Sequence, residues 1–223
     1  AIPTWPSSRA MPTACASMIG TDLMARKDCQ VAGVFGAGDQ ARQHLLALTC
    51  IRPTIKKARV FSPTPANRER FAKEMSEVLG IEVIAVDGPR EVVRDADVIL
   101  CVTNSNVPVF DGNWLSAGQH VTSIVSSNVG LLKRGFVKQM RREIDNKTLN
   151  RADVLMTNVW GQEELDQTAV FWDISLEIPV LASKIVDAGQ VIRGEKQGRT
   201  SDAQITYFKN CAFWGMGAAA IGG

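Results

Sequence analysis

The sequence predicts a doubly wound α/β fold, in which helices cover both faces of a mostly parallel sheet. Two observations support this prediction. Short apolar runs alternate with helical patterns after residue 30, which is typical of parallel βαβ units. The first of these runs also ends in a glycine-rich turn that opens directly into a helix. We therefore expect a Rossmann-type sheet with a nucleotide-binding edge.

Apolar runs bounded by polar or turn residues mark the strands. The expected strands, in chain order, are 31–35, 58–61, 81–86, 97–102, 120–125 and 153–156. His120 opens the fifth of these strands, and we expect it to make a structural hydrogen bond rather than to act as an acid or base.

Helices are predicted from 3.6-residue spacing and from stop signals. Within 65–79, Phe71, Met75 and Leu79 share one face, and Gly80 ends the pattern. A shorter helix is expected over 89–94. The pattern at 11–26 is helical but lies outside the alternation.

A last helix is expected from Ser201 onward. Ser201 and Gln204 have the spacing of a capping box. Ile205 and Phe208 would then lie on one apolar face together with Ala212 and Met216. Such a face must be buried against another part of the protein, or it promotes self-association.

Composition fits a globular protein and argues against several classes of partner. Hydrophobic residues make up 45% of the 223 residues, enough for a sizeable core. A formal net charge of +2 gives no electrostatic case for binding nucleic acid or a membrane. We also find no apolar run long enough for a membrane span and no signal segment.

The cysteines are scattered and form no C-x-x-C pair (Cys15, Cys29, Cys50, Cys101, Cys211). We expect each of them to be a small buried side chain, with neither a metal site nor a disulfide framework. This usage favours a reducing compartment, so we expect a cytoplasmic protein.

The turn after the first strand carries the dinucleotide fingerprint G-x-G-x-x-A. Gly36 allows the tight turn, Gly38 lets the backbone approach a pyrophosphate, and Ala41 lets the helix pack close to the strand. The helix N-terminus offers unpaired N–H groups to phosphates. We therefore assign the whole loop to cofactor binding, including Ala37, Asp39 and Gln40.

The end of the second strand favours NADP over NAD. NAD sites usually place an acidic residue there, but this chain has Ser62. Thr64 and Asn67 offer hydrogen bonds, and Arg68 or Arg70 offers charge for a 2′-phosphate. Further cofactor contacts are expected from a loop beside the nicotinamide ribose and from the fifth strand (Thr103, Asn104, Ser123). NAD remains the alternative cofactor.

Several stretches resemble the ornithine cyclodeaminase/mu-crystallin family: residues 14–17 with 23–26, 35–42, 97–103, 118–124, 142–145 and 198–209. The last is the most specific, because a generic dinucleotide-binding fold does not require it. The resemblance implies a nicotinamide cofactor and hydride transfer at an amino- or imino-bearing carbon of a small amino or imino acid. It also implies a homodimer for a full-length relative.

The chain departs from the family pattern at positions that bear on activity. Pro12 stands where the family usually has an arginine for the substrate carboxylate. Ser127, followed by Asn128, stands where cyclodeaminases have an essential aspartate. We assign these two residues to the catalytic position, and we expect imine (ketimine) reduction rather than ornithine cyclisation. The alternative is a non-catalytic NADPH or small-ligand binding protein, or an inactive truncated cofactor module.

The resemblance also suggests a division of the chain. Residues 1–25 would be a hinge left from a missing substrate and dimerisation domain, and residues 26–200 the NAD(P)-binding domain. Residues 201–223 would be the C-terminal helix that packs back on the missing domain.

Overall fold

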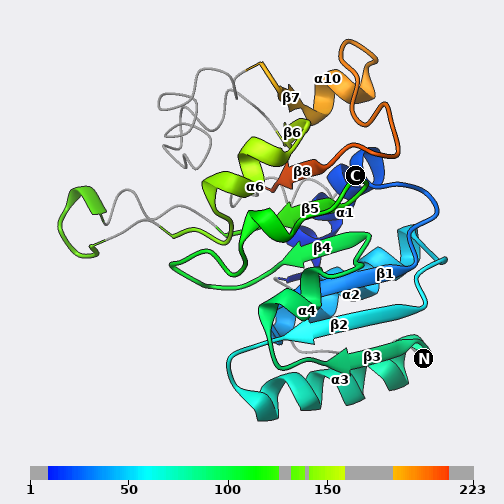
Figure 1. Cartoon of the computed structure of the whole chain (residues 1–223), viewed down its shortest axis with the longest axis vertical. Coiled ribbons are helices and arrows are strands. Elements are labelled where there is room, and N and C mark those ends of the chain that lie inside the picture. Colours follow the sequence, from blue (N-terminus) through cyan, green and yellow to red (C-terminus); the bar gives the residue numbers. More distant parts are fainter. Residues whose placement is uncertain (1–9, 126–131, 139–140, 159–182, 211–223) are drawn as a thin grey trace.

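The structure, a computed structural model, describes residues 10–125, 132–138, 141–158 and 183–210. These residues form one eight-stranded sheet in the order β3-β2-β1-β4-β5-β8-β6-β7, which Figure 1 shows with helices on its two faces. Every neighbouring pair of strands is parallel. The predicted doubly wound α/β fold is confirmed.

The strands are β1 (Val31–Phe35), β2 (Lys57–Phe61), β3 (Glu82–Ala85), β4 (Val98–Cys101), β5 (His120–Ser123), β6 (Val154–Thr157), β7 (Ile185–Asp187) and β8 (Thr206–Lys209). The helices are α1 (Ala10–Met24), α2 (Asp39–Ile51), α3 (Pro65–Leu79), α4 (Pro89–Val93), α6 (Asn146–Arg151) and α10 (Ala188–Ile192), with a 3-10 turn η1 (Gly112–Trp114).

The central strands are buried on both faces, and their side chains alternate between two apolar clusters. In β4, Val98 and Leu100 join the cluster that α2 and α3 cover, whereas Ile99 joins the cluster on the α4 and α6 side. This double burial explains why the strands read as continuous apolar runs. Helix α3 ends at Gly80, whose left-handed φ of +65° confirms the predicted stop.

The helix predicted from Ser201 onward is wrong for residues 201–209. Thr206–Lys209 form β8, which lies between β5 and β6 in the middle of the sheet. Ile205 and Phe208 are buried in the sheet's own core, so they leave no open apolar face. Their three-residue spacing also fits a helix, because a strand buried on both faces lacks polar alternation. Residues 211–223, including Ala212 and Met216, lie outside the described residues.

Helix α1 packs onto the sheet even though it lies outside the strand–helix alternation. It packs against α2 and lies over β5 and β8. The Thr21 and Thr122 hydroxyls are 2.9 Å apart and join α1 to β5 by a buried hydrogen bond. Asn210, directly after β8, donates to the Ser17 hydroxyl at 2.7 Å. Within the described residues, α1 is therefore part of the sheet's covering layer.

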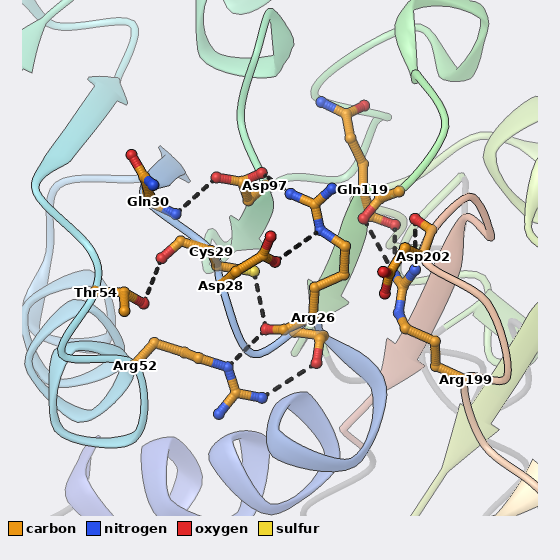
Figure 2. Close-up of polar contacts among 12 residues, drawn as sticks. Arg26, Asp28, Cys29, Gln30, Arg52, Thr54, Asp97, Gln119, Arg199 and Asp202 are labelled. Atoms are coloured by element: carbon orange, nitrogen blue, oxygen red, sulfur yellow. Dashed lines mark hydrogen bonds and ion pairs between the residues drawn. The ribbon is translucent and has the colours of Figure 1, made fainter.

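Arginines fasten the end of α1 to the amino edge of the sheet, as Figure 2 shows. Arg52, directly after α2, donates to the carbonyls of Ala25 and Arg26, at 3.2 and 2.8 Å. Arg26 forms an ion pair with Asp97 at the start of β4. The Asp97 carboxylate also accepts the backbone N–H of Gln30 and Val31 just before and at the start of β1. These contacts set where the first strand begins.

The expectation that every cysteine is buried is only partly correct. Cys29 and Cys101 are buried, but Cys15 and Cys50 are exposed. Cys15 and Cys50 lie on the outer faces of α1 and α2, where the helical pattern places every third or fourth residue in solvent. Cys211 lies outside the described residues.

Candidate functional site

A cavity of about 850 Å³ lies at the carboxyl edge of the sheet, where β1, β2 and β4 end. The chain adds β2 and β3 on one side of β1, then returns to add β4 on the other side. Open α/β sheets bind ligands in the crevice at such a reversal of strand order. The lining comes from the loops after β1, β2 and β4, namely residues 35–40, 42, 61–63, 67, 70, 102–105 and 107–109.

The two glycines of the fingerprint have different roles. Gly36 has a left-handed φ of +107°, and a Cβ there would lie 2.7 Å from the carbonyl oxygen of Val102. Gly38 has an ordinary φ of −98°, and nothing lies within 4 Å of the place its Cβ would occupy. Gly36 is thus required by the fold. Gly38 instead leaves a bare stretch of backbone at the cavity wall, which fits a bound pyrophosphate.

Helix α2 presents its N-terminus to the same cavity. Its first hydrogen bond runs from the Arg42 N–H to the Gly38 carbonyl at 3.1 Å, so the N–H groups before Arg42 have no intrahelical partner. Asp39 and Gln40, from this first turn, line the cavity. Ala41 does not. It is fully buried in the core behind the loop, as expected for a residue that lets helix and strand pack closely.

Arg42, which also lines the cavity, connects the glycine loop to α3. Its guanidinium donates to both oxygens of Glu74, at 2.8 and 2.7 Å, and to the Ala37 carbonyl at 3.3 Å. Hydrogen bonding to the Glu74 carboxylate raises the pKa of Arg42 above its already high value. The sequence analysis gave Arg42 no role, since nothing in the fingerprint shows that Glu74 of α3 lies beside it.

At the end of β2, the structure distinguishes between the two candidate arginines, Arg68 and Arg70. Arg68 donates to the Asp87 carboxylate at 2.5 Å and to the Ser62 carbonyl at 3.1 Å, and it is almost fully buried. It does not line the cavity, so its predicted reach toward a 2′-phosphate is not supported. Ser62 and Arg70 do line the cavity, together with Asn67. Thr64 is exposed at the start of α3 and lies away from the lining.

The loop after β4 forms the opposite wall. Thr103 and Asn104 line the cavity, and their contact with a cofactor stays a prediction. Ser123 does not, because its hydroxyl is buried and donates to Glu143 at 2.9 Å. Glu143 has no exposed surface and also accepts the Thr103 N–H and hydroxyl, at 2.5 and 2.8 Å. The sequence analysis missed Glu143, although it lies in one of the stretches that resemble the family.

The histidines are structural, as predicted for His120. Its ring nitrogens lie 2.9 Å from the hydroxyls of Thr206 and Thr122. Burial, with a smaller contribution from the charge of Arg199, lowers the pKa of His120 to about 3. Burial lowers the pKa of His44 to about 4, and this ring lies between the Ser17 hydroxyl and the Gln40 carbonyl. Both rings are therefore neutral near pH 7.

The predicted catalytic residues, Ser127 and Asn128, lie outside the described residues. The described chain reaches Val125, whose N–H donates to Glu143 at 2.9 Å. The catalytic assignment of Ser127 and Asn128 remains a prediction.

A second cavity, of about 520 Å³, lies at the opposite edge of the sheet beside Arg26 and Arg199. Arg199 donates to the carbonyls of Met24 and Gln204, at 2.6 and 2.7 Å, and to the Thr206 hydroxyl at 3.0 Å (Figure 2 shows its other contacts). Burial lowers its pKa. Because these backbone groups occupy the guanidinium, we assign Arg199 to holding α1 against β8.

The described part of the chain contains no group of three or more His, Cys, Asp or Glu side chains arranged to hold a metal. Nor does any helix in it have the length and apolar character needed to cross a membrane.

The model of the ornithine cyclodeaminase/mu-crystallin family matches residues 7–216 of this chain. The chain belongs to this family. Among curated relatives, an uncharacterized cyclodeaminase of Sinorhizobium fredii is 31% identical over 198 residues, covering 87% of this chain and 55% of its own. A Δ1-pyrroline-2-carboxylate reductase of Bacillus cereus is 28% identical over 204 residues, covering 89% of this chain and 57% of its own.

A solved family structure shares the fold. The Δ1-pyrroline-2-carboxylate reductase of Thermococcus litoralis, in complex with NADH and L-proline, superposes with a TM-score of 0.79. The two sequences are 30% identical, and the match covers 96% of this chain but only 62% of that one. The chain thus spans little more than half the length of the curated family members that it matches.

Proposed function

We propose that this chain is the dinucleotide-binding part of an NAD(P)-dependent imine reductase that acts on a small imino acid. The observation that carries the proposal is the cavity at the strand-order reversal, with the bare backbone of Gly38 and the N-terminus of α2 in its wall. The Thermococcus relative, whose structure holds NADH and L-proline, makes a cyclic imino acid the first substrate to test.

We propose that different residues of the cavity wall bind different parts of the dinucleotide. The turn at Gly36 and the first turn of α2 would hold the phosphates with backbone N–H groups. Ser62 and Arg70 would hold the adenosine end, and Thr103 with Asn104 the nicotinamide end. A bound reduced dinucleotide supplies a hydride to the imine carbon. The imine nitrogen gains a proton in the same reduction, and we propose the Ser127–Asn128 segment as the region that manages it.

We propose NADP as the preferred cofactor, with NAD as the alternative. Ser62 stands at the end of β2, and Arg68, which donates to the Ser62 carbonyl, also engages the Asp87 carboxylate. Arg70 is exposed and lines the cavity, so of the two arginines it is the one we propose as the partner of a 2′-phosphate. The Thermococcus structure holds NADH, so this preference rests on the residues of the present chain.

Two measurements test the proposal. Titrating NADPH and NADH into the purified chain, followed by nicotinamide fluorescence, tests the cofactor site. Consumption of NADPH with Δ1-pyrroline-2-carboxylate, with proline measured as product, then tests the reaction. Absence of dinucleotide binding would refute the proposal. Binding without turnover would favour the alternative of a binding protein or an inactive cofactor module.

A further inference from the structure

The end of β5 is held by two buried charged side chains. The Glu143 carboxylate has no exposed surface, and Lys209 at the end of β8 is 2% exposed. The peptide at Val125 lies between them: its N–H donates to Glu143 at 2.9 Å, and its carbonyl accepts from the Lys209 ammonium. Burying a charged group is costly unless hydrogen bonds compensate it, and both groups here have them.

Glu143 joins two separate loops. One carboxylate oxygen accepts the N–H and the hydroxyl of Thr103, which lines the cavity after β4. The other accepts the Ser123 hydroxyl and the N–H groups of Ile124 and Val125, at 2.9, 3.0 and 2.9 Å. All five neighbours are donors, so only a side chain with two acceptor oxygens satisfies them.

We infer that Glu143 is a positioning residue, which sets the wall formed by Thr103 and Asn104 relative to the chain that leaves β5. It does this without lining the cavity itself. The inference rests on the proposed function, because the wall matters only if a dinucleotide binds there. It also concerns one end of the cavity, since the partners of Glu143 among the described residues belong to the loops after β4 and β5 and not to the Ser62 and Arg70 end.

The substitution Glu143→Gln tests this role. The variant keeps the volume of the side chain but points an amide NH₂ at one set of donors, so one of the two loops loses its partner. We expect the Kd for NADPH to rise about tenfold or more. The Kd for 2′,5′-ADP, which occupies the adenosine end alone, should change less than twofold. A general loss of structure would weaken both ligands alike.

Asp145→Asn is the matched control. Asp145 lies two residues along the same segment and caps α6, with one carboxylate oxygen 2.8 Å from the Thr148 N–H and the other 3.1 Å from the Gly112 N–H. Neither of these two partners of Asp145 lines the cavity. This variant should lower the melting temperature and leave both dissociation constants at the wild-type values.

The outcomes separate the two proposals. If the wild-type chain binds neither dinucleotide, the proposed function is overturned and this inference with it. If the wild type binds NADPH and Glu143→Gln binds it equally well, only the positioning role is overturned. Should Glu143→Gln not fold, Ser123→Ala decides, because Ser123 contacts Glu143 but does not line the cavity. Unchanged NADPH affinity in that variant would overturn the inference.

Discussion

The two glycines of the fingerprint should respond in opposite ways to substitution. At Gly36, alanine would have to adopt a φ of +107° with its Cβ 2.7 Å from the Val102 carbonyl oxygen. Strain of this kind costs roughly 1–3 kcal/mol. For a chain of this size, 1 kcal/mol lowers the melting temperature by roughly 2–4 °C. We therefore expect Gly36→Ala to melt roughly 2–12 °C below the wild type.

Gly38→Val should keep the fold and lose the cofactor. The φ of −98° is open to valine, and no atom lies within 4 Å of the new Cβ. The side chain would instead fill space beside the loop where we propose the pyrophosphate lies. Steric overlap typically costs 1–3 kcal/mol, which corresponds to roughly a 5–150-fold rise in the Kd for NADPH. Thermal unfolding and nicotinamide fluorescence measure the two effects on the same sample.

Gly88→Val provides the control for Gly38→Val. Gly88 is also an N-cap glycine, with an extended φ of −142° at the start of α4, and its Cβ would meet only the Glu91 carboxylate at 3.7 Å. It does not line the cavity. The reasoning fails if Gly38→Val binds NADPH like the wild type, or if it loses as much stability as Gly36→Ala.

Three further predictions follow from the site and the core. Ser62→Asp should reverse the preference from NADPH to NADH, because the new carboxylate repels the 2′-phosphate. Arg70→Ala should raise the Kd for NADPH about tenfold and leave the Kd for NADH unchanged. Both expectations are contradicted if the variants change the two dissociation constants equally. The folded pKa values of His44 (about 4) and His120 (about 3) lie below the ordinary value of 6.5, so the unfolded chain binds more protons as the pH falls below 6.5. The histidines therefore lower the free energy of unfolding only below that pH, and by pH 5 each of them should have lowered it by about 2 kcal/mol. Urea titrations at pH 7 and pH 5 measure this difference, and the difference should be half as large in His120→Asn as in the wild type. With ornithine and either cofactor the chain should form no proline, because Ser127 cannot supply the negative charge that cyclisation requires; robust proline formation would show that Ser127 is misaligned.

Local patterns were sufficient wherever a feature depends on neighbours in sequence. The strand, glycine turn and helix at 31–51 were predicted because turn geometry and helix start are local properties of the chain. The same holds for α3 and its stop at Gly80. For β8 the pattern failed, because Thr206–Lys209 is short and buried on both faces. Its spacing alone does not distinguish a strand from a helix.

The sequence by itself determined the fold class, which depends on apolar periodicity, and the edge of the sheet where we propose that the cofactor binds, which depends on glycines at set spacing. The family was indicated by the resemblance of several stretches of the chain. Only the tertiary structure decided which side chains line the cavity at that edge and which hold its walls in place. It turned Arg68 toward Asp87 and left Arg70 at the cavity. It also brought Glu143 to Thr103, 40 residues away along the chain. Side-chain partners of this kind are set by the packing of distant segments, and no local pattern encodes them.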